Sequence, residues 1–351
     1  MLSLWSDIFR CLQRGEAVVV ATVVQNSGST PRTSGSKMVV YSDGRISGTI
    51  GGGALEGDVI RSALNRYSTR NAGVRSYDLT DTAAPDDLDL ICGGRMQVLI
   101  EYVPVDDASL EVYRVLKDEI RTLRPVLFVR RLVGDDNHLE TDLAVLTAGG
   151  ERAGSISLPA DLVATLRGHA ADCRSASMLA VDDLRYIVEP ILPAETVYVV
   201  GAGHVSREIA RLTGRVGFAT VVIDDRPEFA TEERFPSADA VLVRPDYDQV
   251  FAGLDVDADS CIVIVTRGHR FDRQVLAQAL QTNAGYIGMI GSSRKRDTVY
   301  GALIEEGIDP DDLDRVHCPV GLDIEAETPA EIAVSIVAQL IRHRARQRAN
   351  A

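Results

Sequence analysis

Residues 196–210 read TVYVVGAGHVSREIA, and this stretch decides the fold of the second half of the chain. A strand-like run at 197–200 leads into Gly201-Ala202-Gly203 and then into a helical pattern that ends near Arg215. Glycines at these positions permit a tight turn and let backbone amides at a helix start approach a phosphate. Ser206 replaces the third glycine of the usual G-x-G-x-x-G pattern, which leaves the phosphate-facing part intact. The stretch therefore predicts the phosphate loop of a Rossmann-type nucleotide-binding domain.

The sequence after this loop continues the alternation of strand and helix. Further strands are expected at 220–223, 240–243, 261–266 and 286–290. Such alternation is typical of a parallel sheet with crossover helices, so we predict a Rossmann-like, doubly wound α/β domain over residues 194–351. The sequence also predicts a last helix, with Thr328 as N-cap, Pro329 at the first helical position and Glu331 completing a capping box.

Polar residues near the ends of these strands are candidates for binding a nucleotide-type cofactor. Asp224 and Asp225 follow Gly203 by 21 and 22 residues, where an acidic side chain can accept hydrogen bonds from a ribose. The other candidates in this domain lie in the phosphate loop or after the strand at 261–266, where ligands of such sheets bind: Gly201, Gly203, His204, Arg267, His269 and Asp272. The alternative is a Rossmann-shaped domain with an altered site, because fold alone does not fix function.

The first 104 residues predict a separate, glycine-rich α/β domain. Valine-rich runs at 17–24, 37–41 and 96–103 favour strands, Asp43-Gly44 marks a hairpin turn, and residues 54–67 carry an amphipathic helical pattern. Residues 105–193 contain a helical pattern at 110–123 and strand-like runs at 126–133, 143–147 and 186–191, but no chemical motif. We expect three parts: 1–104, a middle segment with linker at 105–193, and 194–351.

Two segments of the N-terminal domain have the composition of anion-binding loops. Residues 27–37, SGSTPRTSGSK, combine flexible backbone, hydroxyl donors and two cations, which suits a phosphate or another anionic oxygen group. The candidates there are Ser29, Thr30, Arg32 and Lys37. The helix at 54–67 follows Gly51, Gly52 and Gly53 and has Glu56 in its first turn. Backbone amides at such a glycine-rich helix start can also bind an anion. The alternative for both segments is a polar structural loop.

Cys92-Gly93-Gly94 precedes the strand at 96–103, so the thiol of Cys92 is expected at a strand entrance where Gly93 and Gly94 leave room for a large ligand. A thiolate is a soft metal ligand and a nucleophile, although a lone cysteine is usually a small buried hydrophobe. The other four cysteines, Cys11, Cys173, Cys261 and Cys318, receive that second interpretation. Five scattered cysteines without a Cys-x-x-Cys pair indicate neither a disulfide framework nor a zinc site.

The net charge of −14 argues against nucleic acid or an anionic membrane as partner. The start of the chain lacks a basic leader, and the apolar stretch at 17–24 is too short to span a bilayer. We therefore expect a cytoplasmic protein without a bound metal ion of its own. A homodimer is expected because two-fold dimers are the commonest soluble assembly.

Taken together, the motifs resemble the XdhC/CoxI family of molybdenum-hydroxylase accessory proteins. The resemblance rests on the order of Gly28 to Met38, Gly48 to Asp58, Cys92-Gly93-Gly94, Gly201 to Ser206, Ile290-Gly291-Ser292 and Pro319 to Ile336. It adds Gly291 and Ser292 to the candidate cofactor-binding residues. It implies a protein that binds molybdenum cofactor (molybdopterin), assists its sulfuration and delivers it to a xanthine dehydrogenase or related molybdenum hydroxylase.

In that role the chain is a cofactor-binding chaperone rather than an enzyme. Cys92 then acts as a thiolate ligand or in sulfur handling, with a cysteine desulfurase as a further partner. One alternative is a nicotinamide-dependent oxidoreductase that binds NAD(P) through Gly201 to Ser206 and Asp224, although no obvious catalytic tyrosine–lysine pair follows. Another is a non-catalytic interaction scaffold in which the glycine-rich regions are structural turns.

Overall fold

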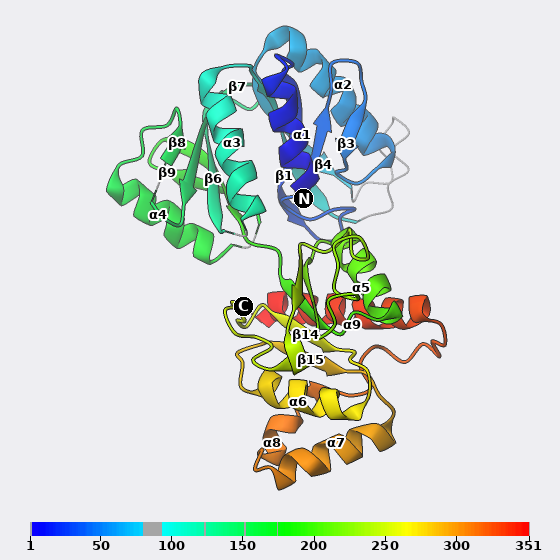
Figure 1. Cartoon of the computed structure of the whole chain (residues 1–351). Coiled ribbons are helices and arrows are strands. Elements are labelled where there is room, and N and C mark those ends of the chain that lie inside the picture. The colour runs from blue at the N-terminus through cyan, green and yellow to red at the C-terminus, as the bar shows by residue number, and fades with distance from the viewer. Residues whose placement is uncertain (1, 80–92, 123, 151, 174, 351) are drawn as a thin grey trace. The chain divides into compact units, whose positions relative to one another are not determined.

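The computed structural model describes residues 2–79, 93–122, 124–150, 152–173 and 175–350. The chain forms two compact units, Met1–Pro193 and Ala194–Ala351 (Figure 1). Both combine helices with a sheet, and the α/β class expected from the sequence is confirmed. Within the residues that the structure describes, no helix is long and apolar enough to cross a membrane.

The first unit is built on one antiparallel sheet in the order β3-β2-β1-β5-β4-β7-β6-β10-β9, with β8 beside β7. Its strands are β1 (Val18–Ser27), β2 (Lys37–Val40), β3 (Ile46–Gly48), β4 (Ala72–Asp78), β5 (Arg95–Val103), β6 (Val126–Asp135), β7 (His138–Thr147), β8 (Arg152–Gly154), β9 (Ser177–Val181) and β10 (Leu184–Ile191). A single residue pair, Ala72 with Leu139, joins β4 to β7. The strands of residues 105–193 thus continue the sheet that begins in residues 1–104.

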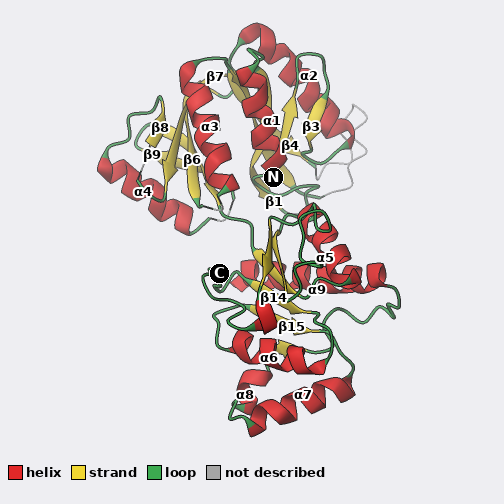
Figure 2. Cartoon of the chain, in the orientation of Figure 1, coloured by secondary structure: helices red, strands yellow, loops and turns green. Residues whose placement is uncertain are grey.

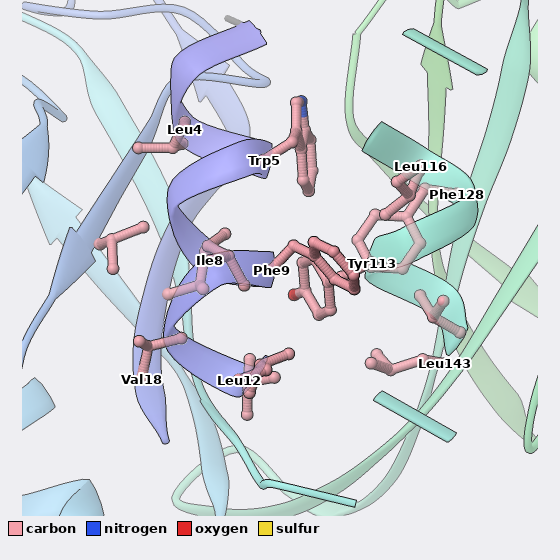
Figure 3. Packing of buried hydrophobic residues seen from close by; sticks show 14 of the residues in the cluster. Leu4, Trp5, Ile8, Phe9, Leu12, Val18, Tyr113, Leu116, Phe128 and Leu143 are labelled. Carbon is pink, nitrogen blue, oxygen red and sulfur yellow. The ribbon is translucent and has the colours of Figure 1, made fainter. Parts of the chain in front are cut away.

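Among the described residues of this unit, four helices cover the sheet: α1 (Leu2–Gln13), α2 (Gly53–Thr69), α3 (Asp107–Arg121) and α4 (Ala160–Ala171). The amphipathic helix α2 packs Leu55, Val59 and Ala63 against one face of β1, β2 and β5. On the opposite face, α1 and α3 share a core with both halves of the sheet. Figure 3 shows Trp5 and Phe9 of α1 pointing toward Tyr113 of α3. The rings of Trp5 and Phe128 pack edge to face, with their centroids 5.8 Å apart.

The second unit is a parallel six-stranded sheet in the order β13-β12-β11-β14-β15-β16. Its strands are β11 (Thr196–Val200), β12 (Ala219–Asp224), β13 (Ala240–Val243), β14 (Cys261–Ile264), β15 (Tyr286–Met289) and β16 (Val316–His317). Numbered along the chain this is 3-2-1-4-5-6, the order of dinucleotide-binding Rossmann domains. The Rossmann-like fold predicted from the glycine loop is confirmed.

Helices cover both faces of the parallel sheet, as the doubly wound class requires (Figure 2). They are α5 (His204–Arg215), the short 3-10 helix η1 (Pro245–Tyr247), α6 (His269–Leu280), α7 (Ser293–Glu305), α8 (Pro310–Leu313) and α9 (Pro329–Asn350). On β11, Val197 and Val199 pack with α5 and α9, whereas Tyr198 and Val200 pack with α6 and α7. Burial on both faces explains the continuous apolar run of this strand.

Candidate functional site

In the first unit, residues 28–36 form a loop between β1 and β2, which we call the serine-rich loop. This loop lies against Gly93 and Gly94. A β-carbon at Gly94 would lie 2.5 Å from the carbonyl oxygens of both Ser27 and Ser29, and one at Gly28 would lie 3.0 Å from the oxygen of Gly93. Only glycine at these positions lets the two backbones approach so closely. Two segments that the sequence singled out separately are therefore neighbours.

A second glycine loop, before α2, joins the same cluster. A β-carbon at Gly51 would lie 2.8 Å from Cβ of Pro31, which belongs to the serine-rich loop. Gly52 and Gly53 both have positive φ, and open space surrounds the position of a β-carbon on each. The structure thus gathers residues 27–31, 51–53 and 93–94 in one region of the unit.

Glu56 fills the anion position that we expected at the start of α2. Its Oε2 accepts hydrogen bonds from the Thr49 hydroxyl at 2.6 Å, the Gly52 amide at 3.2 Å and the Ile50 amide at 3.4 Å. A carboxylate is already stabilised there by amides and by the helix dipole. An added anion at the same point would be repelled, so Glu56 organises this loop from within.

The serine-rich loop is held by Asn26, which sequence reasoning missed. Its Oδ1 accepts from the backbone amide of Ser34 at 2.8 Å and from the Ser34 hydroxyl at 3.0 Å, while its Nδ2 donates to Thr30 Oγ1 at 3.3 Å. The available signal was an asparagine directly before a Ser-Gly turn, because asparagine commonly bonds to nearby backbone. Ser29 and Arg32 are exposed on this loop, where a ligand can reach them.

Two candidates of the first unit have different outcomes. Lys37 lies in the interior, where its ammonium pairs with Glu189 and donates to the carbonyl oxygen of Gly35 at 3.0 Å. Its charge is therefore bound inside the protein, not presented to a surface anion as we expected, because both faces of β2 are covered and Glu189 on β10 supplies a buried partner. Cys92 lies outside the described residues.

In the second unit, Gly201 and Gly203 have different reasons to be glycine. Gly201 has a φ of 111°, and a β-carbon there would lie 2.4 Å from the carbonyl oxygen of Val265, just after β14. This contact joins the loops that follow β11 and β14, the point where ligands bind in such sheets. Gly203 has open space around the position of a β-carbon, and the first turn of α5 contains no acidic residue. The first turn of α5, unlike that of α2, contributes no carboxylate of its own.

Asp224, at the end of β12, binds the glycine loop itself. Its carboxylate accepts from the Ala202 amide at 2.6 Å and from the Arg226 backbone and guanidinium at 2.9–3.1 Å, and the residue is fully buried. Burial by itself raises the pKa of Asp224, but hydrogen bonds from Arg226 and from the Ala202 amide outweigh it and lower the pKa from 3.8 to about 2. The carboxylate supports the loop rather than standing free for a ribose.

Asp225 and Arg267 form an ion pair of 2.6 Å beside this loop. Burial and the adjacent Asp224 carboxylate raise the pKa of Asp225. Arg226 lies within 3.6 Å of the same carboxylate and stacks its guanidinium 3.7 Å from the Phe229 ring. Sequence reasoning missed Arg226, although it directly follows the acidic pair. A third guanidinium, that of Arg234, donates to the Ala202 carbonyl oxygen of the loop at 3.3 Å.

The remaining candidates of this unit divide into internal and exposed groups. Asp272 is buried, accepts from the Thr266 hydroxyl at 2.7 Å and pairs with Lys295, whose ammonium also donates to Ile290 O at 3.1 Å. Ser292 caps α7, since its hydroxyl accepts from the Lys295 amide. A β-carbon at Gly291 would lie 2.8 Å from Cδ of Lys295, so this glycine makes room for that side chain.

The two histidine candidates lie at the starts of helices. His204 is exposed at the start of α5. His269 begins α6, but its side chain is outside the described residues.

The other cysteines are internal or isolated. Cys11 and Cys261 are buried, Cys173 and Cys318 are partly exposed, and all four are free thiols. Burial raises the pKa of Cys261 to about 12, which keeps this thiol protonated and unreactive at neutral pH. No group of three or more His, Cys, Asp or Glu side chains within the described ranges could hold a metal ion.

These features define a protein of two α/β units, one of which is a Rossmann domain with an open helix start at its glycine loop. The family model described as the XdhC Rossmann domain matches residues 197–340, and the model of the XdhC and CoxI family matches residues 11–78. The chain belongs to the XdhC and CoxI family.

Several known proteins are similar along nearly the whole chain. A probable xanthine dehydrogenase subunit of Bacillus subtilis is 27% identical over 95% of this chain and 96% of its own length. The molybdenum cofactor insertion chaperone PaoD of Escherichia coli is 22% identical over 96% of this chain and 86% of its own. The uncharacterized protein YqeB of Escherichia coli is 25% identical over 97% of this chain, which spans only 46% of that protein.

A solved structure has the same fold. The crystal structure of a xanthine dehydrogenase from Bacillus halodurans superposes with a TM-score of 0.79 at 26% identity, covering 99% of this chain and 98% of that one. The similarity therefore extends over both units.

Proposed function

We propose that this chain is an accessory protein that binds molybdenum cofactor and delivers it to a xanthine dehydrogenase-type hydroxylase. Membership of the XdhC and CoxI family supports an accessory role. So does the similarity over 96% of the chain to a protein named as a molybdenum cofactor insertion chaperone. On this proposal the cofactor is cargo and the chain is not itself the hydroxylase. We further propose that the chain assists sulfuration of the cofactor with a cysteine desulfurase as partner. A cytoplasmic location and a homodimer are part of the same proposal.

The observation that carries the ligand part is the open space at Gly203, at the start of a helix without an acidic first turn. A phosphate, or the pyrophosphate of a dinucleotide form of the cofactor, suits backbone amides at such a helix start. At α2 the equivalent position is taken by Glu56. We therefore assign the phosphate end of the cargo to Gly201–Gly203 and α5, with Arg226 and Arg267 as nearby cations.

A second set of candidate ligand groups lies on the serine-rich loop of the first unit. The exposed Ser29 and Arg32 offer a hydroxyl and a guanidinium group for the polar edge of a pterin or for an anionic group, whereas the Thr30 hydroxyl bonds to Asn26 and to the carbonyl oxygen of Arg32 within the loop. Cys92 directly precedes Gly93 and Gly94 in the sequence, and we assign to it the soft, sulfur-handling part of the function. Lys37 and Asp224 enter this proposal only as supports of the loops.

A second candidate is a nicotinamide-dependent oxidoreductase. The strand order of the second unit favours it, because that order is typical of domains that bind NAD(P). The buried state of Asp224 weakens it, since the carboxylate has its acceptor positions filled by Ala202 and Arg226. In the interaction-scaffold alternative neither ligand binds.

Ligand-dependent thermal unfolding separates the three functions. Anaerobically prepared molybdopterin, NAD and NADP are added in turn to the full chain and to two variants. We expect molybdopterin to stabilise the wild type, by about 3 kcal/mol at a hundredfold excess over the dissociation constant. Gly203→Val should remove this stabilisation while the chain stays folded, because its side chain enters the open space that the phosphate needs.

Gly301→Val is the matched control, since Gly301 lies in α7 and also has open space around it. This variant should keep the full shift. Stabilisation of the wild type by NAD or NADP alone would replace the proposal with the second candidate. No shift with any of the three compounds would support the scaffold.

A further inference from the structure

A layer of polar side chains crosses the interior of the first unit between two apolar clusters. On β6, Phe128 belongs to one cluster, Leu132 to the other, and Arg130 lies between them. On β10 the same order appears as Ile191, Glu189 and Ile187. With their counterparts on the other half of the sheet, these residues form what we call the polar layer: Thr22, Lys37, Glu101, Arg130 and Glu189.

The polar layer is buried and its charges balance. Each of its members is at most 8% exposed. Arg130 bonds to Glu101 at 2.7 Å and to Glu189 at 3.1 Å, and Lys37 pairs with the other oxygen of Glu189. Two cations therefore face two carboxylates, so that no member is left as an uncompensated buried charge.

Lys37 is the member that connects this layer to the serine-rich loop. It is the first residue of β2, directly after the loop, and its ammonium donates to the carbonyl oxygen of Gly35 at 3.0 Å. Gly35 in turn packs against Ser175, which precedes β9, with a β-carbon position only 3.3 Å from Cβ of Ser175. Through Lys37 and Glu189 the loop is thus tied to β10, in the other half of the sheet.

We propose that Lys37 is a positioning residue, which holds the serine-rich loop in its ligand-binding arrangement through Glu189 and the polar layer without contacting the ligand itself. A loop ordered before binding loses less conformational entropy when the ligand arrives. This inference rests on the proposed function for its ligand, but the ordering of the loop can be measured without any ligand.

The test compares two double variants of the full chain. Lys37→Met/Glu189→Gln removes one cation and one carboxylate and frees the loop from its tether. Glu101→Gln/Arg130→Met removes the same charges from the same layer but leaves the bond from Lys37 to Gly35. Amide hydrogen exchange of Ser34, Gly35 and Ser36, all hydrogen-bonded in the folded loop, should be at least about tenfold faster in the first variant than in the second.

Binding of molybdopterin is measured on the same samples, well below their unfolding temperatures. The first double variant should bind at least about tenfold more weakly than the second. Equal exchange in the two variants would overturn the positioning role. Faster exchange together with no binding by the wild type would uphold the role of Lys37 and reject the proposed function. Glu189→Gln alone is the milder variant if the first does not fold, and an unchanged loop in it would also contradict the inference.

Discussion

Asp224 illustrates what a motif can and cannot predict about a single residue. The sequence placed an acid at the correct distance from the glycine loop, and the structure places it at the end of β12, beside that loop. An acid there can accept from a ribose or from the protein's own amide, and both satisfy the spacing. Here it accepts from Ala202 and Arg226, which the linear order of residues does not specify.

Asp224 gives the second unit a pH-dependent contribution to stability. Because its pKa is lowered in the folded state to about 2, this contribution is complete above the unfolded pKa of about 4 and is lost as the pH falls through about 2. The shift corresponds to about 2 kcal/mol, and the raised pKa of Asp225 acts in the opposite direction, so the net loss is at or below this figure.

The variant Asp224→Asn should therefore lower the unfolding free energy at pH 7 and approach the wild type between about pH 4 and pH 2. Urea unfolding at a series of pH values measures the difference. Asp297→Asn is the surface control, since Asp297 is exposed and pairs with its neighbour Arg296. Equal stability of Asp224→Asn and wild type at pH 7 would contradict the structural role.

The elements were predictable where local signals are strong. The capping box of α9 is confirmed: the Glu331 amide donates to the Thr328 hydroxyl, and the Thr328 amide donates to the Glu331 carboxylate at 2.9 Å. The valine-rich strands and the helix entered through Gly51–Gly53 also lie where the pattern indicated. α1 was missed although Leu4, Trp5, Ile8, Phe9 and Leu12 have helical spacing. α4 has a weaker signal, with Leu166 as its one fully buried residue among those described.

Thr328→Ala should destabilise the second unit by about 1 kcal/mol, because it leaves the Glu331 amide at the start of α9 without its hydroxyl acceptor. Urea unfolding at neutral pH gives the value. Thr298→Ala provides the comparison, since Thr298 lies inside α7 on its exposed side, where alanine is the better helix former. A loss at Thr298 as large as that at Thr328 would mean that the effect is not one of capping.

At the scale of the whole molecule, the two units differ in how far local patterns could lead. In the second unit every strand pair is parallel and four of the five pairs join strands that follow one another in the chain, so that a glycine motif and regular alternation lead to the correct class. In the first unit β5 lies between β1 and β4, and β10 lies between β6 and β9. These pairings depend on contacts between residues far apart in sequence. For the same reason the sequence alone does not show that Lys37 points inward, since its partner Glu189 lies 152 residues away in the chain.

The role of Cys92 is tested on the whole protein in a cell that lacks its own accessory protein. Cys92→Ser should leave the chain folded but lower the activity of the molybdenum hydroxylase, because a hydroxyl is a poor soft ligand and sulfur carrier. The molybdenum content of the hydroxylase separates failed insertion from failed sulfuration. Cys173→Ser, which changes a partly exposed free thiol, should retain full activity. Full activity with Cys92→Ser would reject a chemical role for this thiol.

The contrast between Gly201 and Gly203 has a consequence for how such chains diverge. Position 201 faces the Val265 carbonyl oxygen at 2.4 Å from where a β-carbon would stand, whereas position 203 faces open space. Selection on the fold alone then keeps glycine at 201 and tolerates drift at 203. In a descendant that has lost its cargo, the first glycine should persist while the second is replaced. A library of substitutions at both positions can be sorted once for folded protein and once for hydroxylase activation. Substitutions at 201 should fail both selections, whereas substitutions at 203 should fail only the selection for activation.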